Sequence, residues 1–140
     1  MFNWEIIGHK KIIHFLETCI QRDNLSQGYL FYGPKSIGKH TLIRRFILNL
    51  MCFNADENKS EIPCMRCEQC RQINKNIHSD VMWIKKEADK KNITVEQIRN
   101  LQESLAVHSF FKLYKICLLY TSPSHETVLD LVCRLLLEKK

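Results

Sequence analysis

Apolar residues recur along the chain with two different periods, and these periods predict alternating helices and strands. Helical spacing appears over about residues 9–22 and 39–52, over a short stretch at 71–80, and again after Thr94, which forms a capping-box pattern with Gln97. Short apolar runs predict strands at 29–32 and 81–84 and a third strand that starts at Tyr114. Strands that alternate with helices are typical of an α/β fold with a parallel sheet flanked by helices.

The helix predicted over 39–52 has one strongly apolar face. Its members are Leu42, Ile43, Phe46, Ile47 and Leu50, which are spaced for one side of a helix. We expect this face to pack against the sheet and expect Arg44 and Arg45 to lie on the solvated side.

Composition limits the class of protein without identifying it. The 140 residues are 45% hydrophobic and 26% charged, which suits one globular domain or a part of a larger one. No apolar run reaches the ~20 residues of a membrane span, and the N-terminus lacks a signal-peptide pattern, so we expect a cytoplasmic protein without membrane partners. The formal net charge of +6 favours anionic partners only weakly.

A glycine-rich loop stands between the predicted strand at 29–32 and the helix at 39–52, which is the setting of a phosphate-binding loop. Its backbone N–H groups would cradle phosphate oxygens, and Lys39 would add a charge near them. The position after this lysine should carry a hydroxyl for Mg²⁺, but His40 stands there and Thr41 follows one place late. The candidate nucleotide-binding residues are Gly33, Pro34, Lys35, Ser36, Ile37, Gly38, Lys39, His40 and Thr41.

Four of the seven cysteines have the spacing of metal ligands: Cys52, Cys64, Cys67 and Cys70. Four thiolates complete a tetrahedral shell around Zn²⁺, and a closed shell leaves no position for a substrate. We therefore predict a structural zinc module at about 52–70, holding a polar excursion (53–63) too small to fold by burial alone. The alternative is a group of reduced thiols without a metal.

These motifs, in this order, resemble the N-terminal part of bacterial DNA polymerase III clamp-loader subunits, of the delta-prime or gamma/tau type, in the AAA+ superfamily. The resemblance covers about residues 3–116. Trp4 and residues 6–9 are similar to a segment that lies near the adenine in the family, and residues 28–39 are similar to its strand and phosphate loop. Cys52 with 63–70 is similar to the inserted zinc module, and 78–81 and 93–99 are similar to the following strand and helix start. The resemblance implies a truncated AAA+ parallel sheet with flanking helices. It also implies a role in loading the sliding clamp during DNA replication.

The subunit type follows from the departure at His40. The gamma type hydrolyses ATP and keeps Thr after the lysine, whereas the delta-prime type often carries an altered loop and acts mainly as a structural member. We therefore favour delta-prime, with structural Zn²⁺, doubtful ATP/Mg²⁺ binding, no ATP hydrolysis, no catalytic residues and no polymerase chemistry of its own. The implied partners, met through the full-length complex, are the gamma/tau and delta subunits, the sliding clamp and primed DNA.

The last segment, 117–140, does not resemble the family. The family's third strand should end in Walker B carboxylates, yet 117–124 contain no acid, and they back-translate naturally to a transposon-end adapter used in sequencing libraries. Our hypothesis is a partial AAA+ nucleotide-binding domain at 1–116 followed by non-native read-through at 117–140. The alternative is a natural amphipathic helix from Thr127 to Lys140.

The residues leave three alternative functions open. One is a gamma/tau-type ATPase, and another is an unrelated P-loop NTPase or kinase, in which the cysteine insertion would have no purpose. The third is a zinc-ribbon protein that binds nucleic acid, but the basic residues are scattered and form no aromatic-basic stripe.

Overall fold

The computed structural model describes residues 2–34, 36–53, 61–85, 87, 89–90, 93–111, 114–121 and 132–139, with side chains described up to residue 120. The chain divides into two compact units, and each is described by itself. The first comprises Met1–Ser26 and His40–His78, and the second comprises Gln27–Lys39 and Ser79–Lys140. No helix in the described part of the chain has the length and apolar composition needed to cross a membrane.

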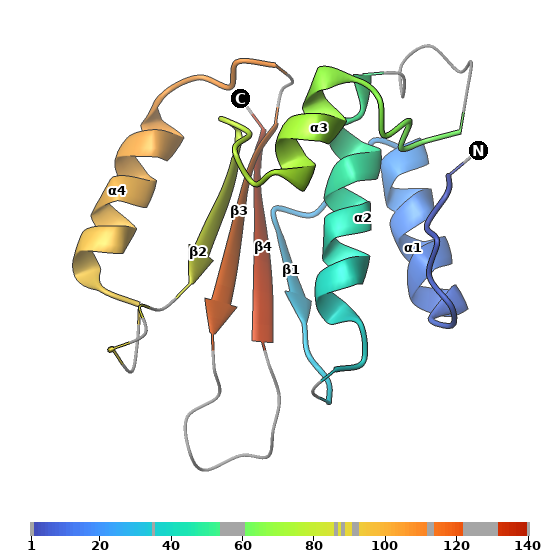
Figure 1. Ribbon diagram of the computed structural model, residues 1–140, viewed down its shortest axis with the longest axis horizontal. Helices are drawn as coiled ribbons and strands as arrows, with labels where there is room; N and C mark the ends of the chain where they lie inside the picture. The colour runs from blue at the N-terminus through green and yellow to red at the C-terminus, as the bar shows by residue number, and fades with distance from the viewer. Residues whose placement is uncertain are drawn as a thin grey trace. The chain divides into compact units, whose positions relative to one another are not determined.

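The order of the elements is α1 (Lys10–Gln21), β1 (Gly28–Phe31), α2 (Lys39–Met51), α3 (Glu68–Asn74), β2 (Val81–Lys85), α4 (Val95–Ala106), β3 (Tyr114–Thr121) and β4 (Val132–Lys139) (Figure 1). The elements from α1 to β3 follow the predicted order, and the strand β4 was not predicted. Most bounds lie within one or two residues of the expected ones. The short helix α3 is the exception, since it begins inside the cysteine-rich segment and ends before residue 78.

The core of the first unit is built around α2. The predicted apolar face is confirmed, because Leu42, Ile43, Phe46, Ile47 and Leu50 are all buried. Burying a side chain of this size contributes about 1.5–3 kcal/mol to folding. Arg44 and Arg45, which we expect on the solvated side, are both half-buried, and both make side-chain hydrogen bonds within this unit.

Arg44 joins α2 to the end of α3. Its guanidinium donates to the backbone oxygens of Ile73 (3.2 Å) and Asn74 (3.1 Å) and to Oδ1 of Asn76 (2.7 Å). The last carbonyls of a helix have no partners inside the helix and carry partial negative charge, so a cation is stabilising there. Arg44 therefore fixes the short α3, which is too short to be stable by itself.

The second unit contains a four-stranded sheet with the order β1-β4-β3-β2 (Figure 1). β2 and β3 are parallel, with Val81 opposite Ile116. β1 and β3 are both antiparallel to β4, so they point in the same direction as each other and as β2. The three strands before residue 122 thus have the predicted parallel orientation, and β4 makes the complete sheet mixed.

β4 corrects one alternative. A helix over Thr127 to Lys140 is wrong for residues 132–139, which form a strand, while 127–131 and 140 lie outside the described residues. β3 also continues to Thr121, beyond the expected end of the native segment at residue 116.

α4 begins with the predicted capping box. The backbone N–H of Gln97 donates to the Thr94 hydroxyl (3.3 Å), and the Thr94 N–H donates to Oε1 of Gln97 (2.9 Å). Gln97 also donates from Nε2 to the backbone oxygen of Lys85 (2.9 Å), at the end of β2. One side chain therefore both starts the helix and attaches it to the edge strand.

Candidate functional site

The candidate phosphate loop follows β1 directly and has the backbone that the glycine pattern predicts. Gly33 and Gly38 have φ values of 145° and 89°, and Ser36 between them is left-handed at 65°. A Cβ at either glycine would meet no atom within 4 Å, so the conformation itself is what requires glycine there. Turns of this kind direct successive N–H groups to one side and form a concave anion-binding nest.

Lys39, the first residue of α2, folds back over the loop. Its ammonium group donates to the backbone oxygen of Gly33 and to that of Pro34 (2.7 Å). In this state the charge is held by the loop's own carbonyls. A phosphate in the loop would compete for the same three N–H donors of the ammonium group.

The other predicted loop residues are placed as follows. Pro34, Ser36 and Ile37 are exposed, and Lys35 lies outside the described residues. His40 and Thr41, which belong to the first unit, are both exposed in the first turn of α2.

The four predicted metal ligands are brought together in the first unit. Their Sγ atoms all lie within 4.8 Å of one another, although Cys52 and Cys64 are separated by 11 residues in the chain. Zn–S bonds of about 2.3 Å in a tetrahedron place the sulfurs about 3.8 Å apart, so a small contraction would complete a zinc shell. Cys52 and Cys70 are buried, and Cys64 and Cys67 are half-buried.

Local backbone turns position these sulfurs. The N–H groups of Cys64, Cys67 and Cys70 donate to the sulfurs of Cys52 (3.4 Å), Cys64 (3.4 Å) and Cys67 (3.5 Å) respectively. Cys67 is also the N-cap of α3, which explains why that helix starts inside the cluster. The same bonds that shape the turns stabilise negative charge on sulfur.

The thiols differ in acidity. Burial raises the pKa of Cys64, but backbone hydrogen bonds from Arg66 and Cys67 and side-chain hydrogen bonds with Cys67 and Cys52 lower it to about 7. For Cys70, burial and the neighbouring sulfurs of Cys67 and Cys52 raise the pKa far above the usual range. Four close thiolates repel one another without a cation, so full ionisation requires the positive charge of a metal. The donor set thus fits Zn²⁺.

Each unit also contains one buried polar contact that the motifs did not predict. The buried His78 ring contacts Oε1 of Gln69 through Nε2 (2.5 Å), next in sequence to the predicted ligand Cys70. The fully buried carboxylate of Asp80 accepts from the backbone N–H groups of Phe110 (3.1 and 3.0 Å) and Phe111 (3.0 Å). The sequence signals for His78 and Asp80 are their place just before an apolar strand and the family resemblance of residues 78–81.

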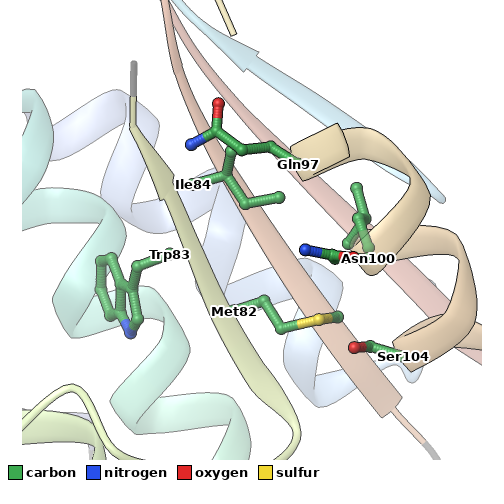
Figure 2. A pocket seen from close by; sticks show the side chains of 7 residues that line it. Met82, Trp83, Ile84, Gln97, Asn100 and Ser104 are labelled. Atoms are coloured by element: carbon green, nitrogen blue, oxygen red, sulfur yellow. The ribbon is translucent and has the colours of Figure 1, made fainter. Parts of the chain in front are cut away.

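A separate open groove of about 310 Å³ lies between β2 and α4 in the second unit. Figure 2 shows Met82 and Ile84 pointing toward α4, where Asn100 and Ser104 face them, while Trp83 points to the other side of β2. None of the predicted site residues lines this groove.

Comparison with known proteins supports one family. Residues 8–125 match the family model described as "DNA polymerase III, delta subunit". The chain is 32% identical over 106 residues to DNA polymerase III subunit gamma/tau of Mycoplasma genitalium, covering 76% of this chain and 17% of that protein. It is 31% identical over 109 residues to subunit delta' of Bacillus subtilis, covering 76% and 31%. A further relative, subunit gamma of Buchnera aphidicola (from Acyrthosiphon pisum), is 30% identical over 115 residues, covering 80% and 30%.

The chain spans 17–31% of the length of these three curated relatives. The family match includes both the candidate phosphate loop and all four clustered cysteines. On this basis the chain belongs to the DNA polymerase III delta-subunit family, and its resemblance to the clamp-loader subunits of that polymerase is confirmed.

Proposed function

We propose that this chain is part of a delta-prime-type clamp-loader subunit of DNA polymerase III. In the full-length complex it takes part in loading the sliding clamp onto primed DNA during replication, in the cytoplasm, together with gamma/tau and delta subunits. The single observation that carries the proposal is that one family match, over residues 8–125, contains both the glycine-rich loop and the four-cysteine cluster. The parallel direction of β1, β2 and β3 agrees with an AAA+ sheet.

The loop's role is at most to bind a nucleotide, without hydrolysing it. The left-handed Gly33 and Gly38 and the folded-back Lys39 support phosphate binding. At the next position an imidazole replaces the hydroxyl that would bind Mg²⁺, a hard cation that prefers oxygen. β3 carries no acidic residue from Tyr114 to Thr121, so this strand offers no second oxygen ligand for the metal.

The cysteine cluster holds one structural Zn²⁺ through Cys52, Cys64, Cys67 and Cys70. The clustering of the sulfurs within 4.8 Å supports this role, and a closed shell of four thiolates has no open position for chemistry. The ion would stabilise a segment whose own buried apolar surface is small.

Segment 117–140 is proposed to be non-native from about residue 117. The family match runs to residue 125, past this boundary, but β4 lies beyond the match and runs antiparallel between two strands that are parallel to each other. The sequence of the source locus tests this directly. Finding the codons for 117–140 between genuine upstream and downstream codons would contradict it.

A matched pair of variants tests the two sites independently. We expect about one zinc per chain, saturable binding of a fluorescent ATP analogue, and no ATP turnover. Lys39→Ala should abolish nucleotide binding and leave the zinc content unchanged, while Cys64→Ser should remove zinc. Failure to bind nucleotide would reduce the proposal to a structural role, and absence of zinc would reject the metal site.

The second candidate is a gamma/tau-type ATPase, which is favoured by the relatives of that type. His40→Thr restores the hydroxyl, and if it creates ATP turnover in the full-length protein, the loop descends from an active one. Turnover by the unaltered chain would instead favour the gamma/tau type or an unrelated NTPase.

A further inference from the structure

The first residues of the chain are attached to the entrance of the cysteine cluster. Phe2 forms a parallel β-bridge with Ile62, and the backbone N–H of Asn3 donates to the Ile62 oxygen (2.5 Å). The indole N–H of the buried Trp4 donates to Oε1 of Glu17 in α1 (2.8 Å). Residues 2–5, here called the N-terminal segment, therefore lie between α1 and the chain that leads into Cys64.

Arg45 of α2 contacts both sides of this junction. Its Nη2 forms an ion pair with Glu5 of the N-terminal segment, and its Nη1 donates to the sulfur of Met65 at 3.8 Å. Met65 stands between the predicted ligands Cys64 and Cys67. The Arg45 side chain is only 15% exposed, whereas that of Glu5 is 55% exposed.

Both residues that Arg45 contacts have an unfavourable backbone. Glu5 and Met65 are left-handed, with φ values of 47° and 56°. This conformation is unfavourable for a residue with a Cβ, and it persists only where surrounding contacts favour it. Arg45 supplies such a contact to both residues from one rigid, planar group with several donors.

We propose that Arg45 is a positioning residue that couples metal binding at the four cysteines to the order of the N-terminal segment. The inference rests on the proposed metal site. Zn²⁺ fixes Cys64 and Cys67 and thereby the Met65 turn, which places the sulfur against Nη1 of Arg45. The guanidinium then presents Nη2 to Glu5, and the Ile62 bridge aligns Phe2 and Asn3.

The coupling must act in both directions. If metal binding favours the ordered segment, the ordered segment favours metal binding by the same factor. Loss of the Arg45 link should therefore weaken zinc binding even though Arg45 is not a ligand. We expect about a fivefold loss of zinc affinity, at the lower end of the range for coupled sites.

Trp4 provides a reporter within the N-terminal segment. The chain contains two tryptophans, so a Trp83→Phe background leaves Trp4 as the single emitter. Adding Zn²⁺ to the metal-free protein in this background should shift the Trp4 emission to shorter wavelength as the segment becomes ordered. Zinc stoichiometry and affinity are measured on the same samples by competition with a chromogenic chelator.

Arg45→Met and Arg71→Met form a matched pair in this background. Both remove one arginine of the first unit, but Arg71 is an exposed residue of α3 and is not part of the junction. Arg45→Met should abolish the zinc-dependent Trp4 shift and lower the zinc affinity about fivefold. Arg71→Met should preserve the shift and stay within about twofold of the parent affinity. Glu5→Gln removes the ion pair alone and should reduce the zinc-dependent shift of the Trp4 emission. If Arg45→Met does not fold, an unreduced shift in Glu5→Gln would contradict the coupling.

The outcomes separate the coupling from the metal site. If zinc binds one per chain but Trp4 does not respond, or if Arg45→Met keeps the full response, the coupling is wrong and the metal site stands. If no zinc binds to the parent protein, the metal site is wrong and the coupling falls with it.

Discussion

Asp80 gives the most direct test of how the second unit is held together. The side chain is fully buried, and its carboxylate accepts from the N–H groups of Phe110 and Phe111, about 30 positions along the chain. Its own backbone oxygen accepts from the N–H of Ile116 (2.8 Å) at the start of the β2–β3 pairing. One residue thus fastens the turn after α4 to the sheet, and its replacement should destabilise this unit.

The magnitude follows from the acceptors that each variant keeps. In Asp80→Asn one oxygen can still accept from Phe110 and Phe111 at the 3.0 Å positions, but the other becomes an NH₂ group that faces the Phe110 donor. Two charge-assisted bonds become neutral, at about 1 kcal/mol each, so the loss is about 2 kcal/mol. Asp80→Ala leaves both N–H groups without this acceptor and should cost about 3 kcal/mol or more.

Burial of the charge works in the opposite direction. Removing a buried carboxylate relieves its desolvation cost, and apolar replacements of buried charges are sometimes stabilising. At Asp80 the two donors remain after the replacement, so we expect the unsatisfied N–H groups to outweigh this gain. Asp80→Leu separates the two effects, because it removes the charge and fills the space yet still offers no acceptor.

The assay is urea unfolding followed by Trp83 in a Trp4→Phe background, since Trp83 lies in β2 of the same unit. Asp89→Asn is the matched control, being the same change at an exposed turn. An Asp80→Asn loss below about 0.5 kcal/mol, or a stability gain in Asp80→Leu, would refute the reasoning because surface substitutions fall in that range.

Four further outcomes follow from the contacts of Thr94, Arg44 and Cys64. Thr94→Ala removes the N-cap of α4 and should cost about 1 kcal/mol in urea unfolding, whereas Thr94→Ser should be nearly neutral. Arg44→Met leaves the carbonyls at the end of α3 without their cation and should cost about 1–2 kcal/mol, read from Trp4 in the Trp83→Phe background; an unchanged midpoint would contradict the role of Arg44. In the metal-free protein, the alkylation rate of Cys64 should rise with pH to half its maximum near 7, the folded pKa, while burial raises the pKa of Cys117 to about 11 and keeps it unreactive. Because the pKa of Cys64 is lowered on folding from 9.0 to about 7, its ionisation stabilises the metal-free fold above pH 9, and this stabilisation is lost as the pH falls through 7.

The helices and the first three strands were predictable because their apolar periods are clear, whereas the strand β4 was not predicted. α2 is the best case, since its whole predicted face is buried. In α4, where apolar residues also repeat at helical spacing, Leu101 is buried but Ile98 remains 36% exposed. Periodicity reports which side chains share a face, whereas burial also depends on what covers that face, and this information is not local in the sequence.

The placement of the arginines was not predictable for the same reason. Consecutive Arg44 and Arg45 on an amphipathic helix read as solvated residues, yet Arg44 contacts the end of α3 and Arg45 contacts Glu5, about 40 positions earlier. Their partners are backbone carbonyls and a residue with a left-handed backbone, which carry no sequence signature. The cysteine cluster was predictable because the two-residue gaps alone bring three of its four cysteines together.

The proposed metal site and the N-terminal segment both belong to the first unit, and α2 (Lys39–Met51) carries the side chain that contacts both. The contacts of Arg45, in the middle of α2, show one physical route: the left-handed turns at Met65 and Glu5 are joined by a single side chain of the same helix. Loss of zinc should then disorder the N-terminal segment before it affects Gly33–Lys39, and comparison of Trp4 order with nucleotide binding in the same metal-free sample would separate the two effects.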